Sequence, residues 1–360
     1  MFVALRDLRY ARGRFALISI VIAMVALLVT FLSSLTAGLA HASTSAVTGL
    51  PADRLAFGMP SAEDAVDFTS STVTREQWTG WAGVPGVAAA EPLGVVTTRA
   101  GSDATTMAVT ALGAEPGSSL VPGGAPEDGD VVLTRPAAED LSVDVGDTLT
   151  LNGTTLTVGR IADRDDQLAH TPVVWLSLAD WQQVGARGST GGAPTATVIA
   201  LRTDASVDLA AADAEFGTST VATPDARSAV ASYQAENLSL TTIQAFLMAI
   251  SALVVGAFFT VWTIGRQGDI AVLKALGATD RYLLRDAVGQ AALLLIGAVA
   301  LGTGLAALLG TLLSGALPVV VGPSTTLLPA GVLIVVGLLG AAVAVARIAR
   351  TDPHAALAAR

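Results

Sequence analysis

The sequence predicts an α-helical membrane protein with four transmembrane helices and a two-lobed α+β extracellular domain. Hydrophobic residues make up 52% of the 360 residues and charged residues only 14%, which is more apolar than an ordinary soluble enzyme. Four apolar runs are long enough to cross a bilayer, and a polar, acidic segment separates the first run from the second. The chain therefore combines membrane-embedded and water-exposed parts.

Each apolar run reaches the length of about 20 residues that a membrane helix needs. The runs cover residues 15–39, 240–264, 287–321 and 327–346. The third is longer than one crossing requires, and we expect it to end near Leu317. A signal peptide is the alternative for the first run, because arginines precede it and Ala40-His41-Ala42 resembles a cleavage site. Its apolar part exceeds the about 7 to 15 residues of a signal sequence, which favours a retained anchor.

The charges are distributed asymmetrically about these runs. Residues 40–235 hold 24 acidic residues and nine arginines, whereas the rest of the chain holds eleven basic residues and, leaving Glu236 aside, five acidic ones. Positive charge concentrates on the cytoplasmic side of membrane proteins, so we expect both termini to be cytoplasmic and the large domain to face outward. The net charge of −10 argues against a nucleic-acid partner. Membrane lipid is the expected surrounding of the four apolar runs.

These observations divide the chain into nine segments. They are a cytoplasmic amphipathic helix (1–14), a first span (15–39), the extracellular α+β domain (40–235), a second span (236–265), a cytoplasmic coupling helix (266–285), a third span (286–317), an outer loop (318–326), a fourth span (327–348) and a cytoplasmic tail (349–360).

The outer domain shows strand and turn signals. The segment "DGDVVLTRPAAEDLSVDVGDTLTLNGTTLTVGRIAD" predicts a strand at 131–133, a helical turn at 137–141, and strands at 148–151 and 155–161. Asn152-Gly153 between two alternating runs predicts a two-residue hairpin. A glycine-rich break at 185–194 precedes a second lobe. That lobe is expected to contain a strand at 196–202 and a helix at 208–216.

Motifs for intrinsic enzymatic chemistry are missing from the sequence. The chain has no cysteine, and its one lysine, Lys274, does not lie in a Gly-x-x-x-x-Gly-Lys-Ser/Thr loop, so the chain has no ATPase site of its own. The histidines His41, His170 and His354 lack metal-binding spacing and are expected to be exposed or capping residues. Asp163, Asp165 and Asp166 lack the pattern of a calcium loop. We therefore expect no enzyme and no intrinsic cofactor.

The segment "RQGDIAVLKALGATDRYLL" follows the second span and is amphipathic. Apolar positions such as Ile270 and Leu273 alternate with Asp269 and Lys274 at helical spacing, and Gly277 ends the helix. Such a helix can anchor in lipid headgroups or dock onto a cytoplasmic protein. A protein that lacks its own ATPase and carries a movable outer domain needs an external energy source, which favours docking.

This segment resembles the cytoplasmic loop of FtsX/MacB-type ABC transporter permeases, which usually reads Arg-x-x-Glu-Ile-x-x-Leu-(Lys/Arg)-Ala-(Leu/Ile)-Gly-Ala. Asp269 replaces the usual glutamate. The residues that match and are expected to contact the ATPase, with Asp269, are Arg266, Ile270, Leu273, Lys274, Ala275, Leu276 and Gly277. The tail "ARTDPHAALAAR" also resembles the end of such permeases, and the layout of one span, an outer domain and three spans covers the whole chain.

The resemblance implies a MacB-like outer domain and a mechanotransmission transporter in the cell membrane. It implies two copies of a separate cytoplasmic ATPase subunit that hydrolyse ATP, and a second permease, most simply in a homodimer. In size and layout the chain looks most like the haem-exporting (HrtB-like) permeases of Gram-positive bacteria, so haem is the expected substrate. Export of lipoproteins, peptides or drugs, activation of cell-wall hydrolases, and a membrane-anchored sensor or scaffold are the alternatives.

If haem is the substrate, its iron needs ligands near the outer membrane boundary. The candidates are Glu236, Tyr233, Met248 and His41, with Glu236 first and Tyr233 second. Tyr233 and Glu236 are three residues apart and so share one helical face. In the alternative interpretation, Glu236 only caps the start of a helix. Small residues at 245, 249, 252 and 256 would let the second span approach another helix closely.

Overall fold

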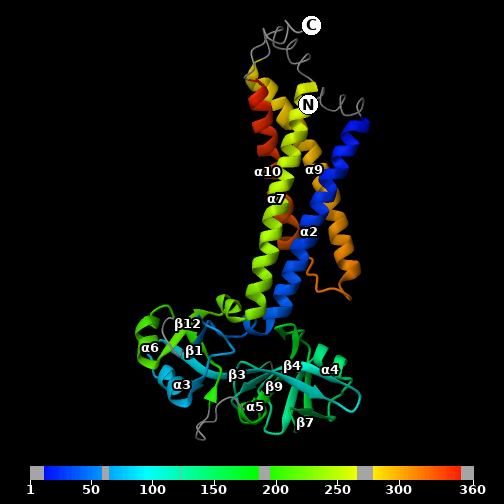
Figure 1. Ribbon diagram of the computed structural model, residues 1–360. Helices are drawn as coiled ribbons and strands as arrows, with labels where there is room; N and C mark the ends of the chain where they lie inside the picture. The colour runs from blue at the N-terminus through cyan, green and yellow to red at the C-terminus, as the bar shows by residue number, and fades with distance from the viewer. Residues whose placement is uncertain (1–11, 59–64, 122, 186–194, 266–278, 350–360) are drawn as a thin grey trace. The chain divides into compact units, whose positions relative to one another are not determined.

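The computed structural model describes residues 12–58, 65–121, 123–185, 195–265 and 279–349. Internal contacts divide the chain into two compact units. The first, called the helical unit, is drawn from Met1–Gly38 and Leu238–Arg360, and the second, called the α/β domain, is Leu39–Asn237. Each is described by itself below (Figure 1).

The helical unit is built on four long helices. They are α2 (Arg12–Thr48), α7 (Ala231–Gly265), α9 (Asp280–Leu313) and α10 (Pro323–Ala349). Each contains a stretch long and apolar enough to cross a membrane, so the predicted four membrane helices are confirmed. Within this unit the helices alternate in direction, which places the described start of α2 and the described end of α10 at the same end (Figure 1).

Glycines set the closest helix contacts in this unit. A Cβ atom added at Gly302 of α9 would lie only 2.1 Å from the carbonyl oxygen of Ala23 on α2. One residue further along α9, Thr303 Oγ1 lies 3.3 Å from Thr30 Oγ1 of α2. The buried apolar core of the unit consists of Ile22, Ala23, Ala26, Val29, Val255, Ala291, Leu295, Ala298, Val299, Leu333 and Ala341. Small side chains at such contacts allow helix backbones to approach closely in a membrane.

The α/β domain contains one large mixed sheet and a two-stranded sheet. The strand order of the large sheet is β12-β1-β11-β3-β4-β9-β5-β7-β6, with β8 paired to β9, while β10 pairs with β2. The strands are β1 (Arg54–Gly58), β2 (Val73–Thr74), β3 (Val87–Gly101), β4 (Thr106–Ala114), β5 (Asp130–Thr134), β6 (Thr148–Leu151), β7 (Thr154–Ala162), β8 (Gln167–Leu168), β9 (Thr171–Ser177), β10 (Thr195–Ala196), β11 (Val198–Thr203) and β12 (Thr218–Ala222).

The long strand β3 closes part of the sheet on itself. Besides β11 and β4, it pairs with β6, where Ala100 lies opposite Leu151. Strands β3, β4, β9, β5, β7 and β6 therefore form a ring, and β11, β1 and β12 extend from β3. Closure protects strand edges that would otherwise be free to pair with other chains.

The sheet carries a core on each face, because successive strand residues point to opposite sides. On β1, Ala56 belongs to one buried cluster, and Leu55 and Phe57 belong to the other. The described part of the domain contains five short helices: α3 (Arg75–Ala82), α4 (Arg135–Leu141), α5 (Leu178–Gly185), α6 (Leu209–Phe216) and the 3-10 helix η1 (Asp225–Ala229). Helices α3 to α6 pack on the Ala56 side, whereas the last turn of α2 and η1 pack on the Leu55 side.

The predicted hairpin is confirmed, and the predicted lobe boundary needs correction. Strands β6 and β7 pair with Leu151 opposite Thr154, and Asn152 (φ 47°) and Gly153 (φ 87°) both adopt the positive φ that this tight turn needs. The second lobe, however, is discontinuous in sequence. The segment after the glycine-rich break supplies β11, but this strand lies between β1 and β3, which both precede the break. Hydrogen bonding between distant strands, which the local sequence does not encode, decides this arrangement.

Candidate functional site

Three of the four predicted haem-ligand candidates lie on the parts of α2 and α7 that belong to the α/β domain. Tyr233 and Glu236 are in the first two turns of α7, and His41 is in the last turns of α2. Met248 is not among them, because it belongs to the helical unit, where it packs partly buried against the apolar core.

Glu236 is held by a histidine from a distant loop. Its Oε1 atom lies 2.8 Å from Nε2 of His170, in the turn between β8 and β9, and the side chains of the two residues are 36% and 34% exposed. Ser43 of α2 places its Oγ 3.0 Å from the same Nε2 atom, and Ser43 is fully buried. One imidazole nitrogen thus contacts both α2 and α7.

The interpretation of Glu236 as a helix cap is wrong. Helix α7 begins at Ala231, so Glu236 is its sixth residue and lies beyond the first turn, in which the N–H groups lack helical partners. The apolar run from which the span was predicted starts later than the helix does. The Glu236 carboxylate instead contacts the imidazole of His170.

The backbone of the loop is fastened to α2. The N–H groups of Ala169 and His170 donate to the carbonyl oxygens of Ser43 and Ala42 at 3.0 and 3.1 Å. Both donors have positive φ, 49° at Ala169 and 63° at His170. A left-handed pair of this kind is uncommon for residues with a side chain and points two successive N–H groups in a similar direction. Gln167 adds a further hydrogen bond, from its N–H to Ser45 Oγ at 2.9 Å.

Further charged groups surround this contact. Nε2 of His41 lies 3.6 Å from a carboxylate oxygen of Asp165, and the Asp165 side chain is 77% exposed. Asp166 hydrogen-bonds the guanidinium of Arg164 and raises the pKa of Arg164 above its ordinary value. On the other side, the guanidinium of Arg227 lies 5.8 Å from the ring centre of Tyr233.

The geometry does not support a hydrolytic triad or a metal ion held by protein side chains alone at this point. In a Ser-His-acid triad the serine and the acid contact opposite imidazole nitrogens, whereas Ser43 and Glu236 share Nε2. Ser43 is also inaccessible to a substrate. Among the residues that the structure describes, no group of three or more His, Asp or Glu is placed to hold a metal ion. The arrangement can hold two helices together and offer donor atoms at its exposed edge.

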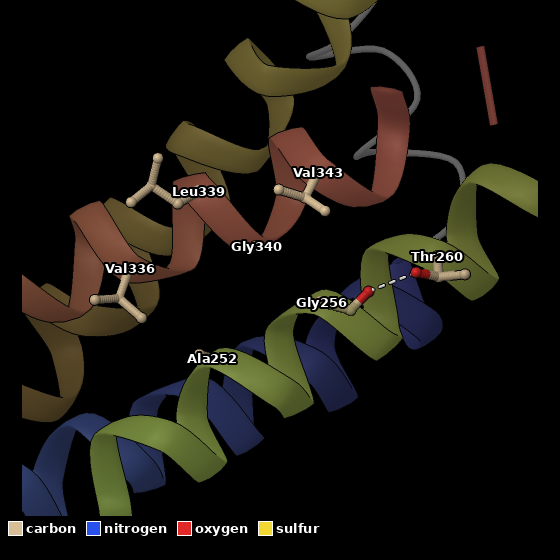
Figure 2. Close-up of a pocket in the computed structure, with 7 residues that line it drawn as sticks. All are labelled: Ala252, Gly256, Thr260, Val336, Leu339, Gly340 and Val343. Carbon is tan, nitrogen blue, oxygen red and sulfur yellow. Dashed lines mark hydrogen bonds between the residues drawn. The ribbon is translucent and has the colours of Figure 1, made fainter. Parts of the chain in front are cut away.

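A groove between α7 and α10 is the second candidate region, and it lies in the helical unit (Figure 2). It has a volume of about 430 Å³ and is lined by Ala252, Gly256, Thr260, Val336, Leu339, Gly340 and Val343. The two helices approach closely at Gly340, where an added Cβ would lie 3.3 Å from Ala252 O and 3.7 Å from Gly256 Cα. The expected close approach is therefore confirmed at 252 and 256, while Ala245 and Ala249 are exposed and take no part in it.

The residues predicted to contact an ATPase, Arg266 to Gly277, lie outside the described residues. His170 and Ser43 were not predicted as site residues. His170 is separated from Glu236 by 66 positions and from Ser43 by 127, and no motif links them. The only local sign was the turn composition around "QLAHT", which indicates a loop but gives no partner.

Comparison with protein families matches nearly the whole chain. A family model described as the MacB-like periplasmic core domain matches residues 15–218, which is more than half of the chain. A second model, described as the FtsX-like permease C-terminal region, matches residues 241–353. Together they cover most of the α/β domain and all or part of each of the four long helices, and residues 219–240 lie between the two matches.

Similar curated proteins fall into two groups. HrtB of Staphylococcus epidermidis, named as a hemin transport system permease protein, is 30% identical over 141 residues. That match covers 39% of this chain and only 40% of the length of HrtB. An ABC transporter permease of Mycobacterium bovis is 27% identical over 360 residues, with 98% of both chains covered. A permease of Mycobacterium tuberculosis has the same identity and coverage.

Solved structures of two outer domains are also similar. The extracellular domain of the ABC-type transporter YknZ from Gram-positive bacteria covers 47% of this chain and 98% of its own, with 16% identity and a TM-score of 0.34. The periplasmic region of MacB from Actinobacillus actinomycetemcomitans covers 51% and 94%, with 9% identity and a TM-score of 0.35.

Proposed function

The chain belongs to the FtsX/MacB-type permeases of ABC transporters, and from this premise we propose that it is the permease subunit of a haem efflux pump. Permeases of this family work with a cytoplasmic ATPase. The sequence has no phosphate-binding Gly-x-x-x-x-Gly-Lys-Ser/Thr loop, which fits an energy supply from a separate subunit. We infer a homodimer of this chain with two ATPase copies, which dock at Arg266, Asp269, Ile270, Leu273, Lys274, Ala275, Leu276 and Gly277.

The mechanism in this proposal is mechanical, and one observation carries it. Helices α2 and α7 run without a break from the helical unit into the α/β domain, with 37 and 35 residues. Each is longer than the about 20 residues that a bilayer crossing needs. An unbroken helix transmits displacement along its axis, because every turn is hydrogen-bonded to the next. Movement of the spans would therefore reach the domain directly.

The loop before β9 would hold the two helices to the domain during such movement. Backbone hydrogen bonds fasten it to Ala42 and Ser43 of α2, and the His170 imidazole fastens it to Glu236 of α7. The polar contacts lie at the ends of both helices that belong to the domain. A displacement of either helix then has to move the loop or break these contacts.

Haem is the proposed cargo because of two supporting observations. The matched part of HrtB is 30% identical, and that relative is named for hemin transport. In addition, Glu236 and Tyr233 on α7 and His41 on α2 carry a carboxylate, a phenol and an imidazole, which are groups that can ligate haem iron. We propose Glu236 as the first ligand and Tyr233 as the second, with haem iron as the metal there. His41 and Met248 remain further candidates.

We expect Glu236→Ala to shift the Soret band of the haem-loaded dimer and to lower haem tolerance of cells. Removal of a carboxylate ligand changes the iron coordination, whereas assembly with the ATPase does not depend on it. Absorbance spectra of purified protein and growth in graded haem measure both effects. Tyr233→Phe should act in the same direction, more weakly, and Glu215→Ala, an exposed glutamate on α6, serves as the matched control.

Two results would contradict the proposal that haem is the cargo. If Glu236→Ala and Tyr233→Phe both match the unmodified protein in spectrum and tolerance, neither residue is a ligand. If the unmodified dimer binds no haem and releases none from ATP-driven proteoliposomes, the cargo is a lipoprotein, a peptide or a drug. Stimulation of a cell-wall hydrolase without any transported molecule would instead indicate a mechanical activator.

The proposed orientation places both termini in the cytoplasm and the α/β domain outside, because of the arginine-rich flanks and the acidic domain. A protease site inserted between Gly191 and Gly192 should be cut by external protease on intact cells, and a site appended after Arg360 should be protected. Immunoblotting of the fragments measures this. The reverse pattern would place the domain inside.

A further inference from the structure

We propose that the segment 314–322 between α9 and α10, called the strap, fixes the angle at which α2 crosses α9, so that α2 follows the movement of α9. Gly38 is the residue that permits the contact. The role of the strap rests on the proposed function, whereas its geometry is tested without haem or an ATPase. The strap, α9, α10 and the part of α2 up to Gly38 all belong to the helical unit.

The strap is ordered by its own hydrogen bonds and is attached to both neighbouring helices. At its start, the N–H group of Leu317 donates to the carbonyl oxygen of Leu313, the last residue of α9, at 2.9 Å. At its end, the hydroxyl of Thr325 in the first turn of α10 donates to Val320 O at 3.0 Å. The same hydroxyl accepts a hydrogen bond from the N–H group of Gly322 at 3.0 Å. The strap is therefore carried along by α9 and α10.

The strap contacts α2 over the last turn that α2 contributes to the helical unit. The N–H group of Val320 donates to Ser34 O at 3.1 Å. One turn later, the backbone of Pro318 lies directly against Gly38, and a Cβ atom added at Gly38 would overlap the carbonyl group of Pro318. The atoms that would be overlapped are backbone atoms, which cannot rotate away as the end of a side chain can. Only glycine at this position leaves the strap in place.

An earlier contact between α2 and α9 determines what the strap can do. At Gly302, α9 lies against the backbone of Ala23 on α2. A single crossing point of this kind would leave α2 free to pivot on α9. Gly38 lies about 20 Å further along the axis of α2 than Ala23, at a rise of about 1.5 Å per residue. Contact at both places prevents the pivot and fixes the angle between the two helices.

The order of the helices in the chain explains why a fixed angle matters for the proposed function. The segment predicted to dock onto the ATPase joins α7 to α9, so these two helices take up its displacement through the chain itself. Helix α2 has no such link, and it receives the displacement through contacts alone. Because α2 continues into the α/β domain, a fixed angle passes the movement of α9 on to that domain. A free pivot would lose it.

Helix α7 contacts the same stretch of α2 from another side. The Thr36 hydroxyl donates to Leu32 O at 2.8 Å, and its oxygen lies 2.9 Å from the amide nitrogen of Gln244 on α7. Each residue turns an α-helix by about 100°, so Thr36 and Gly38 lie on different faces of α2. The two contacts can therefore be removed separately, which makes Gln244 a control for Gly38.

The first experiment measures the angle directly. Because the chain has no cysteine, Leu35→Cys on α2, half-buried, and Leu312→Cys on α9, exposed, can carry the only two spin labels. Distance distributions are recorded for the full chain in nanodiscs, without nucleotide. We expect one narrow distance when Gly38 is present. In Gly38→Ala, a separated population should rise at least about fivefold, because overpacking destabilises the contact between the strap and α2.

Matched variants assign the effect to the strap. Gly315→Ala adds the same methyl group to the strap where no other atom lies within 4 Å, and it should keep the narrow distance. Gln244→Leu should also keep it, since only the contact with α7 is lost. If Gly38→Ala does not fold, Val320→Pro gives the same test by removing the N–H donor, with Val320→Ala as its control. A narrow distance in Gly38→Ala and Val320→Pro, or equal separation in Gly315→Ala, would overturn the proposal.

The second experiment measures whether the strap couples ATP hydrolysis to transport. In proteoliposomes with the ATPase, Gly38→Ala should release at least about threefold less haem per ATP hydrolysed, which is within the range of mutations along a coupling contact. Gly315→Ala should match the unmodified chain. A separated population with unchanged transport per ATP would overturn the role of the strap in coupling. An unmodified chain that transports no haem would instead contradict the proposed cargo, and the distance measurement would still decide whether the strap fixes α2.

Discussion

Replacing Lys274, Ala275 and Leu276 together by glycine should abolish stable association with the ATPase subunit. Glycine costs about 1 kcal/mol relative to alanine at an interior helix position and somewhat less relative to lysine or leucine, so the three substitutions together destabilise the predicted docking helix by about 2 to 3 kcal/mol. Loss of the Leu276 side chain removes an apolar contact in addition. Because 1.4 kcal/mol corresponds to a factor of ten in affinity, we expect association to weaken by more than about tenfold. Affinity purification from membranes with both subunits tagged measures it.

The conservative variant Lys274→Arg is the control for this experiment. The motif that the segment resembles accepts either basic residue at that position, so Lys274→Arg should copurify with the ATPase like the unmodified chain. The triple variant should still fold and reach the membrane, which size-exclusion chromatography of the detergent-solubilised membrane fraction can report. Full association and transport in the triple variant would mean that the ATPase docks elsewhere.

Gly302→Ala should destabilise the helical unit, although alanine is the better helix former. The added methyl group would lie 2.1 Å from Ala23 O and 2.8 Å from Ala26 Cβ, so α2 and α9 have to move apart. Overpacking of this kind costs about 1 to 3 kcal/mol. For a chain of 360 residues that corresponds to a fall in the unfolding midpoint of about 1 to 4 °C, measured by heating the chain in detergent.

Gly304 provides a matched comparison on the same helix. It is exposed, and an added Cβ there would meet no other atom within 4 Å. Gly304→Ala should therefore raise the midpoint slightly or leave it unchanged, since alanine gains up to about 1 kcal/mol in a helix. Equal midpoints for the two variants would show that α2 and α9 do not meet at Gly302 as described.

Features encoded within a few residues were predictable from the sequence. Length and hydropathy were enough to predict the four membrane helices. A turn signal between two alternating runs was enough to predict the Asn152-Gly153 hairpin. The start of α7 was missed because Ala231 to Asn237 is too polar for an apolar run, although its helix is continuous with the span. The family was predicted from the resemblance of the loop after the second span, because hydropathy alone does not distinguish one family of membrane proteins from another.

The site depended on tertiary contacts that the sequence does not mark. His170 has no helical spacing to any of the predicted ligand candidates, and it meets Glu236 because the turn after β8 is bonded to α2. The order of the strands in the sheet could not be predicted for the same reason, because it depends on contacts between residues far apart in the sequence. Strand β11 lies between β1 and β3, so the second lobe takes segments from both ends of the domain sequence. A glycine-rich break marks a surface loop but does not say which strands its flanks will join.

The position of β1 also determines when the domain can finish folding. Its partners in the sheet are β11 and β12, which begin at Val198 and Thr218, whereas β1 itself ends at Gly58. At the usual rate of synthesis, β1 waits on the order of 10 s for its first partner to leave the ribosome. During that time both edges of β1 are unpaired and can bind wrong partners. The strand contains Leu55, Ala56 and Phe57, which are all fully buried in the folded domain. The first strand of the domain to be made is thus among the last to be secured, because both of its partners are made late.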